Sequence, residues 1–247
     1  MTFGGLSAGS KRRQPHMANA QNLQTTTSFS SLPRELVSEV LARVAASSST
    51  DLFRAKLCCK RFADVAEDNR VYQRVSLAKF DIVPWRKNPK VSMFVKKCRR
   101  CKNPDALYRK GVVNYFRGKN VESALQRVEE AVKAGHDEAA YALAVIFVFG
   151  GEELKQKGMA MLSGMKKSAA QRRRVKEWRD NLRRILKMIW VQNSLVLGKR
   201  PICCGSQHKR KRGWGPDELD AVESTYEGCA CDEEIGPICD ALPQIAV

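Results

Sequence analysis

Hydrophobic positions from residue 32 onward recur at the three- and four-residue spacing of amphipathic helices. The first such stripe consists of Leu32, Leu36, Val37, Val40, Leu41 and Val44. Pro33 fits the first turn of a helix, because its missing N–H would have no acceptor there. The pattern therefore predicts a helix of about 12 residues that starts at 31–33 and ends before the loop AASSST.

A second stripe follows Thr50-Asp51, which can form a new helix N-terminus. Its apolar positions are Leu52, Ala55, Cys59, Phe62 and Ala66. The spacing predicts a helix that continues through Phe62 and places Cys59 and Phe62 on one buried face. Cys58 then points elsewhere, so the adjacent cysteines are interpreted as helix positions rather than as a reactive pair. A second short helix should end at Val71-Tyr72.

The middle of the chain contains an internal repeat. Residues 78–103 are predicted to be a basic connector, which two prolines interrupt. Residues 105–136 then align with 137–168 at a period of 33, so that Tyr108 matches Tyr141 and Gly118 matches Gly151. Small residues at 111/144 and, after one inserted residue, at 124/158 would let paired helices approach closely. This period and register predict stacked helical hairpins over 104–168.

Residues 169–197 are predicted to form one long basic amphipathic helix, which Gly198 and Pro201 would end. Its apolar seam consists of Val175, Trp178, Leu182, Ile185, Ile189 and Val196. Arginines and lysines fill the other faces, and we interpret them as a solvated surface of a helix that packs on the repeats. Binding to nucleic acid or to the chain's own acidic tail is an alternative.

Composition separates both ends of the chain from this helical middle. Residues 1–27 are rich in Gly, Ser, Thr, Gln and Asn and are expected to be disordered. Residues 198–247 are expected to be a cysteine-containing, mostly flexible tail. In this tail a basic cluster at 208–212 precedes nine acidic residues without Lys or Arg. The all-α fold class follows from the helical spacing between these ends.

The net charge of +18 indicates acidic partners, nucleic acid or an acidic membrane surface. The longest apolar run, 139–149, is too short to span a bilayer, and the first 27 residues lack the apolar segment of a signal peptide. We therefore expect no membrane and a location in the nucleus, the cytoplasm or both. HKRKR at 208–212 could act as a nuclear import signal.

The chemistry-bearing residues do not form a recognisable active site. Cys98 and Cys101 form one CxxC pair, while the tail cysteines and His208 supply zinc-ligand types at irregular spacing. Reduced thiols without a metal or cofactor are the expectation. The sequence contains no Ser-His-Asp order, P-loop or Gly-rich nucleotide loop, so no catalytic residue is predicted.

Residues 28–77 resemble an F-box. The resemblance includes Leu-Pro at the start, Asp-Leu opening the second helix, Cys-Lys-Arg followed by an aromatic residue, and a final Asp-x-x-x-aromatic. The matching positions are Leu32, Pro33, Glu35, Leu36, Val40, Leu41, Val44, Asp51, Leu52, Leu57, Cys59, Lys60, Arg61, Phe62, Asp68 and Tyr72. The sequence departs from the pattern in its Ser/Ala-rich filler between the helices and in Tyr72, where Trp is frequent.

The F-box resemblance implies the substrate-recognition subunit of an SCF-type ubiquitin ligase, which binds a Skp-family adaptor and through it a cullin. Such a chain is a non-catalytic adaptor that brings a target protein near the conjugating enzyme. The residues implied in adaptor binding are Leu32, Pro33, Leu36, Val40, Leu41, Leu52, Leu57, Cys59 and Phe62. We leave open for each whether it packs inside the module instead.

The repeats at 105–168 resemble Sel-like repeats, which are relatives of the tetratricopeptide repeat. An F-box followed by such a pair resembles a group of plant F-box proteins. The resemblance implies that the repeats bind the target protein, with Tyr108, Tyr115 and Tyr141 on the candidate face. The alternative is a basic helical-repeat scaffold with a degenerate F-box that binds nucleic acid, although the aromatic positions do not favour that partner.

Overall fold

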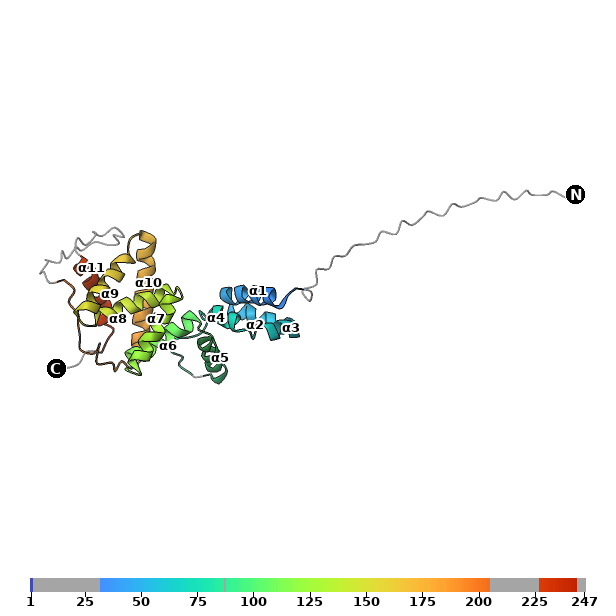
Figure 1. Ribbon diagram of the computed structural model, residues 1–247, viewed down its shortest axis with the longest axis horizontal. Coiled ribbons are helices and arrows are strands. Elements are labelled where there is room, and N and C mark those ends of the chain that lie inside the picture. The colour runs from blue at the N-terminus through green and yellow to red at the C-terminus, as the bar shows by residue number, and fades with distance from the viewer. Residues whose placement is uncertain (2–31, 87, 205–226, 244–247) are drawn as a thin grey trace. The chain divides into compact units, whose positions relative to one another are not determined.

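The computed structural model describes residues 1, 32–86, 88–204 and 227–243. Within these ranges all regular secondary structure is helical, and Figure 1 shows the helices in chain order from α1 to α11. This confirms the predicted all-α fold. The segment 2–31, which contains most of the stretch expected to be disordered, and the basic cluster at 208–212 lie outside the described residues.

Four short helices form the region that resembles an F-box: α1 (Arg34–Ser47), α2 (Ser49–Cys58), α3 (Lys60–Val65) and α4 (Asn69–Arg74). Side-chain caps separate them. The Ser48 hydroxyl accepts a hydrogen bond from the Asp51 N–H at 3.2 Å, and the Asp68 carboxylate accepts one from the Arg70 N–H at 2.9 Å. α1 is longer than predicted, because it continues through the two alanines that follow Val44.

The helix predicted to run through Phe62 is in fact two helices, and the prediction that Cys59 lies on a buried face is wrong. Cys59 is in an extended conformation between α2 and α3, and its Sγ accepts a hydrogen bond from the Phe62 N–H at 3.4 Å. The cysteine is exposed and Phe62 is only half-buried. The cause is local: a residue that caps a helix start cannot also continue the preceding helix.

The predicted connector contains a helix that was not predicted because of the two prolines, α5 (Pro89–Arg100). Pro89 occupies the first helical turn, where proline is favoured, and the Asn88 side chain caps the backbone N–H groups of Lys90 and Val91. Phe94 from α5 contacts Phe53 of α2 with 5.2 Å between ring centroids, and it also contacts Tyr72 and Phe80. This helix therefore completes the aromatic side of the F-box core.

Two helical hairpins form the repeats, as predicted: α6 (Pro104–Phe116) with α7 (Val121–Lys133), and α8 (Asp137–Val148) with α9 (Glu152–Gly164). The small residues do allow a close approach. A Cβ on Gly111 would lie 2.9 Å from the Ala124 carbonyl oxygen, and one on Gly158 would lie 2.7 Å from the Ala144 carbonyl oxygen. Both hairpins have a glycine against a carbonyl of the partner helix. The glycine lies on the first helix of the first hairpin and on the second helix of the second hairpin.

The long basic helix α10 (Ala169–Met188) is shorter than predicted and ends at Ile189 in an extended conformation. The chain after it folds back onto the first hairpin. The backbone N–H of Asn193 donates to the Phe116 carbonyl, and its side-chain amide donates to the Tyr115 carbonyl at 2.9 Å. Val196 is buried as the seam predicted, but it packs from this returning segment rather than from a helix.

The tail was predicted to be mostly flexible, and for residues 227–243 this prediction is wrong. Helix α11 (Glu227–Cys239) packs against α9 and α10, and it buries Ile235 and Ile238 completely. Its Glu234 carboxylate is 1% exposed and accepts a hydrogen bond from the Tyr141 hydroxyl at 2.8 Å. Lys166 and Arg179 lie 2.7 and 3.0 Å from the same carboxylate. Buried apolar groups and this ion pair network stabilise an otherwise acidic segment.

Candidate adaptor-binding surface and cationic pocket

Three of the predicted adaptor-binding residues are exposed apolar side chains on the first two helices. Leu36 and Val40 lie one turn apart on α1 and are 53% and 49% exposed, and Leu57 at the end of α2 is 87% exposed. Leucine and valine gain about 1.5–3 kcal/mol on full burial. An arrangement that leaves three of them in water can therefore bind an apolar partner surface.

Two other predicted contacts have a different role, because Leu41 and Leu52 are buried inside the helical module with Val37 and Val71. Their side chains are only 3% and 1% exposed, so they have no further surface to bury against a partner. The assignment of Leu41 and Leu52 to the adaptor surface is thus corrected to internal packing. Helical spacing alone could not separate the two sets, since both faces of α1 carry apolar residues.

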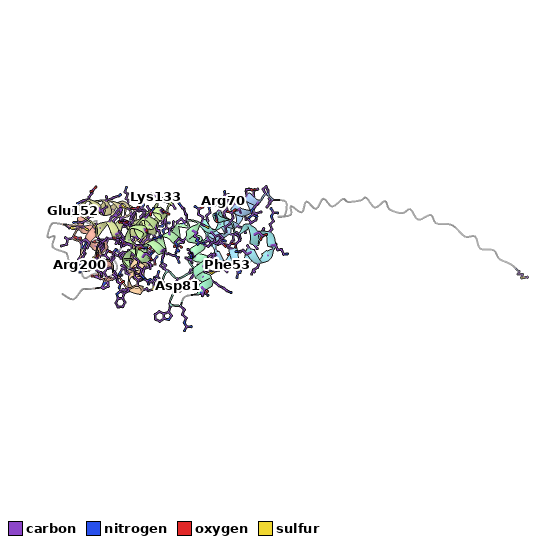
Figure 2. The ribbon with its side chains drawn as sticks, turned by 60° about the horizontal axis from the view of Figure 1, so that its bottom comes forward. Phe53, Arg70, Asp81, Lys133, Glu152 and Arg200 are labelled. Carbon is purple, nitrogen blue, oxygen red and sulfur yellow. The ribbon has the colours of Figure 1, made fainter. Side chains whose placement is uncertain are left out.

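The remaining predicted contacts lie near the helix starts. Leu32 and Pro33 occupy the two positions before α1, and Cys59 and Phe62 lie at the start of α3. Phe53, which the sequence analysis did not select, lies on α2 four residues before Leu57 and is labelled in Figure 2. It is 39% exposed, so part of its ring is available beside Leu57 while the rest contacts Phe94.

A polar cluster around Glu67 links the F-box helices to α5. The Glu67 carboxylate accepts hydrogen bonds from Lys56 of α2, Lys97 of α5 and the Tyr72 hydroxyl. Partial burial opposes ionisation of the carboxyl group, but the hydrogen bonds from Lys56, Lys97 and Tyr72 outweigh it and lower the pKa to about 2. Lys97 also lies 4.2 Å from the Tyr72 ring centroid.

Asn103 is a second polar link between the two regions, and it is 2% exposed. Its amide nitrogen donates to the carbonyls of Tyr72 and Val75, at 3.0 and 2.9 Å, while its Oδ1 caps the N–H of Ala106 at the start of α6. One side chain therefore satisfies backbone groups on both the last F-box turn and the first repeat helix. Neither Glu67 nor Asn103 was selected from the sequence, because the contacts that link the two regions, from Glu67 to Lys97 and from Asn103 to the Tyr72 and Val75 carbonyls, join positions about 30 residues apart.

The tyrosines suggested as a target-binding face are buried, so this suggestion is wrong. Tyr108, Tyr115 and Tyr141 are 1%, 4% and 0% exposed. Tyr108 packs on His136 with 4.9 Å between ring centroids, and His136 itself caps α8 by accepting a hydrogen bond from the Ala139 N–H. The repeated aromatic positions form the interior of the hairpins, since large apolar rings in register fill the space between stacked helices.

A cationic pocket opens instead between α5 and the first hairpin. Its volume is about 260 Å³, and its lining consists of Arg99, Arg100, Leu107, Ser123, Gln126, Arg127 and Glu130. Among the described residues, none of the three arginines forms an ion pair with an acidic side chain. Arg127 donates a hydrogen bond to the Ser123 carbonyl, at 2.9 Å. Three arginines face one acidic residue, Glu130, in this lining, so the pocket carries a net positive charge.

The pKa values of two basic residues support the conclusion that the pocket is positively charged. Partial burial, followed by the charges of Arg127 and Arg100, lowers the pKa of Arg99. Burial and the charges of Arg99 and Arg127 likewise lower the pKa of Lys110 on α6. Like charges held close together at a partly buried surface are stabilised by a bound anion. The sequence analysis described 78–103 only as a basic connector, and the contribution of Arg127 depends on the fold.

The cations of α10 are divided between internal contacts and solvent. Arg179 pairs with Glu234 of α11, and Arg183 lies 3.5 Å from Asp180 on its own helix. The alternative that the basic helix binds the acidic tail therefore holds for Arg179. Arg172, Arg173 and Arg174 are exposed, as expected for an outer face. Trp190 is 79% exposed and does not lie on the apolar seam.

No cluster of three or more metal-ligand side chains occurs in the part of the chain that the structure describes. Cys98 is buried and Cys101 lies at the end of α5, where its thiol is 3.3 Å from the Asn69 side-chain oxygen. His208 lies outside the described residues. In the described ranges, no helix combines the length and the apolar content needed to cross a bilayer.

Comparison with known families agrees with the two regions of the fold. Residues 29–78 match a family model described as F-box-like, and residues 78–187 match a model described as plant tetratrico peptide repeats. The first model covers α1 to α4, and the second covers α5 to α10 except for the last residue of α10. The unpredicted α5 therefore belongs to the repeat match. No solved structure matches the chain significantly.

Two curated relatives come from Arabidopsis thaliana. The putative F-box protein At1g67623 is 31% identical over 169 residues, which are 68% of this chain and 56% of that protein. The F-box protein At2g35280 is 32% identical over 120 residues, which are 49% of this chain and 73% of that protein. The chain thus spans little more than half of the first relative. With these matches and this fold, the chain belongs to the F-box protein family and combines an F-box with plant tetratricopeptide-type repeats.

Proposed function

We propose that this chain is the substrate-recognition subunit of an SCF-type ubiquitin ligase. In this proposal the F-box helices bind a Skp-family adaptor, which connects to a cullin, and the repeat region binds a target protein. The observation that carries the proposal is the exposure of Leu36, Val40 and Leu57 on a module whose own core is already filled. The family membership supports it.

Binding energy in protein interfaces is concentrated in a few apolar anchors that become fully desolvated. Among Leu36, Val40 and Leu57, Leu57 is the most exposed and Leu36 is the next. Small helical modules also gain stability from a partner, because their surface is large relative to their core. In this proposal the adaptor therefore covers the exposed side of α1 and α2.

Co-expression with a Skp-family adaptor tests the adaptor step. We expect wild type to co-purify, and the double variant Leu36→Ala/Leu57→Ala to bind at least 10-fold more weakly. Leu154→Ala is the matched control, because Leu154 is a 44% exposed leucine on α9. The proposal fails if wild type does not bind, or if the double variant binds as well as the Leu154 variant. Circular dichroism would show whether each variant is folded.

For the target protein, we propose that the cationic pocket binds an acidic segment. Arginine groups bind carboxylates and phosphates through paired hydrogen bonds, and Arg99, Arg100 and Arg127 lack acidic partners among the described side chains. The pocket lies on the repeat region, so a target bound there leaves the exposed F-box leucines free for the adaptor.

Binding of a fluorescent glutamate-rich peptide can test this site. The test compares two double variants of the chain that have the same net charge. We expect Arg99→Gln/Arg127→Gln to weaken peptide binding by about 10-fold. The control Arg173→Gln/Arg174→Gln also removes two positive charges, but from the exposed face of α10. It should change binding by less than about 2-fold. Equal losses in both variants would show unspecific attraction, and tighter binding of RNA than of peptide would favour the nucleic-acid alternative.

The expected location in the nucleus, the cytoplasm or both remains part of the proposal. A fluorescent fusion, with and without replacement of the basic cluster at 208–212, measures it directly.

A further inference from the structure

Four cysteines from two distant segments meet in pairs at the end of the repeat region. Cys203 and Cys204 lie in the segment after α10, and Cys229 and Cys231 lie on α11. The Sγ atoms of Cys203 and Cys231 are 2.8 Å apart, and those of Cys204 and Cys229 are 3.2 Å apart. None of the four is in a disulfide in the structure. Each sulfur therefore faces a sulfur of the other segment.

Contacts with the backbone of Cys203 and Cys204 hold this segment next to α11. The Asp232 carboxylate accepts hydrogen bonds from the N–H groups of Cys203 and Cys204, at 2.7 and 3.1 Å. Gly228 allows the close approach, since a Cβ at this position would lie 2.8 Å from the Cys203 carbonyl oxygen. The sulfur pairs are thus positioned by contacts that do not involve the thiols themselves.

The arrangement differs from a zinc site. Tetrahedral zinc requires four ligands around one point, and no group of three metal-ligand side chains is present in the described ranges. Cys229 and Cys231 are two residues apart on a helix, so they project about 200° apart around its axis. The sulfurs therefore gather as two separate pairs.

We propose that each pair is a modification site at which glutathione disulfide produces a protein disulfide, Cys203 with Cys231 and Cys204 with Cys229. The proposal concerns the attachment of α11 and does not depend on the adaptor or the target protein.

The reaction is thiol–disulfide exchange. One cysteine thiolate attacks a sulfur of glutathione disulfide, whose S–S bond breaks and releases one glutathione thiolate. The paired cysteine thiolate then attacks the protein sulfur of this mixed disulfide and releases the second glutathione thiolate. The two protons from the cysteine thiols pass to the two glutathione thiolates. Each protein pair loses two electrons, and one glutathione disulfide is reduced to two glutathione molecules.

Accessibility and acidity set the order of the two sites. The sulfur of Cys231 raises the pKa of Cys203, and burial adds to this effect. The sulfur of Cys204, followed by burial, raises the pKa of Cys229 to about 11. The Cys203 and Cys229 thiols are thus less often ionised at neutral pH, which slows exchange through them. Cys231 is 3% exposed, whereas Cys204 and Cys229 are both partly exposed. The pair of Cys204 with Cys229 should therefore form first.

Disulfides at these positions would fix α11 to the segment after α10. Helix α11 carries Glu234, which contacts Tyr141 of α8 and Arg179 of α10. Closing the chain between 204 and 229 restricts the unfolded state and so stabilises the docked helix. Reduction would return α11 to attachment by packing and ion pairs alone.

The test uses the full chain, purified with a reducing agent and analysed for zinc before incubation with glutathione disulfide. Peptide mapping after alkylation should find the links Cys203–Cys231 and Cys204–Cys229, and dithiothreitol should remove them. The oxidised chain should melt about 5–10 °C higher than the reduced chain. Cys204→Ser should retain only the first link. Cys58→Ser, in which the altered thiol lies on α2 and donates to the Arg54 carbonyl, should retain both.

Three results would overturn the proposal. The first is the absence of any disulfide at an excess of glutathione disulfide. The second is a different pairing, such as a link between Cys203 and Cys204. The third is stoichiometric zinc that the Cys204→Ser variant fails to retain, because this result would assign the sulfurs to a metal.

Discussion

Helix α8 buries every residue from Tyr141 to Val148, whereas α1 leaves Leu36 and Val40 about half exposed. The repeats place their aromatic residues inside the hairpins, and close backbone contacts at Gly111 and Gly158 tighten the packing. The F-box helices are short, and polar side chains such as Glu67 join them to α5. The repeat region thus completes its own core, while the F-box leaves apolar surface that a partner can cover.

Within the repeat region, the largest effect should come from disturbing the close contact in the second hairpin. In Gly158→Ala, the added Cβ would lie 2.7 Å from the Ala144 carbonyl oxygen and 2.9 Å from Val148, so backbone must shift. We expect a loss of about 2–3 kcal/mol in the free energy of unfolding, measured in urea. Gly164→Ala on the same helix meets nothing within 4 Å and should stabilise by up to about 1 kcal/mol.

Removing the buried charge at α11 should have the next largest effect. Glu234→Gln leaves Lys166 and Arg179 without their carboxylate, which should cost about 2 kcal/mol in thermal or urea unfolding. Glu233 is an exposed neighbour, and Glu233→Gln should change stability by less than about 0.5 kcal/mol. Equal effects of the two substitutions would contradict the burial of α11 against the repeats.

A smaller and pH-dependent effect is expected at Glu67. Its pKa is lowered from 4.5 to about 2, so its ionised form stabilises the fold above pH 4.5 and this stabilisation is lost as the pH falls towards 2. Because the side chain is 47% exposed, solvent screening leaves about 1 kcal/mol. Glu67→Gln should lower stability by this amount at pH 7. The difference from wild type should shrink between pH 4.5 and 2, and a constant difference would contradict the role of the charge.

The smallest effect on stability should accompany a large effect on binding. Leu57→Ala removes a side chain that is 87% exposed, so the melting temperature should change by less than about 2 °C. Leu52→Ala on the same helix removes a buried side chain and should destabilise by about 2–4 kcal/mol. A strong loss of stability in the Leu57 variant would show that this leucine belongs to the core.

The regions differ in how much their sequences reveal. The repeats were predictable because Tyr108 and Tyr141 recur at the period at which the hairpins stack. The F-box was recognisable from its ordered motif, yet the motif could not separate buried Leu41 from exposed Leu36. Burial depends on which face of α1 meets α4, and this contact involves residues about 30 positions away.

Helices α5 and α11 were missed for related reasons. Prolines and charges made 78–103 appear irregular, but the packing of Phe94 against rings from three other segments stabilises α5. The acidic composition of α11 suggested a solvated tail, because the burial of Glu234 depends on Lys166 and Arg179 from other helices. The cationic pocket likewise combines α5 and α7. In each case the determining contact is distant in sequence.

The buried Asn103 has a consequence for how this gene could have been assembled. Its amide satisfies carbonyls of Tyr72 and Val75 and also caps α6, so the F-box and the repeats share one residue. A recombination event that joined a foreign repeat array after residue 77 would leave those two carbonyls unsatisfied and Phe94 absent. Exchange of target specificity among such genes should therefore preserve α5 and Asn103, and vary the sequence beyond them.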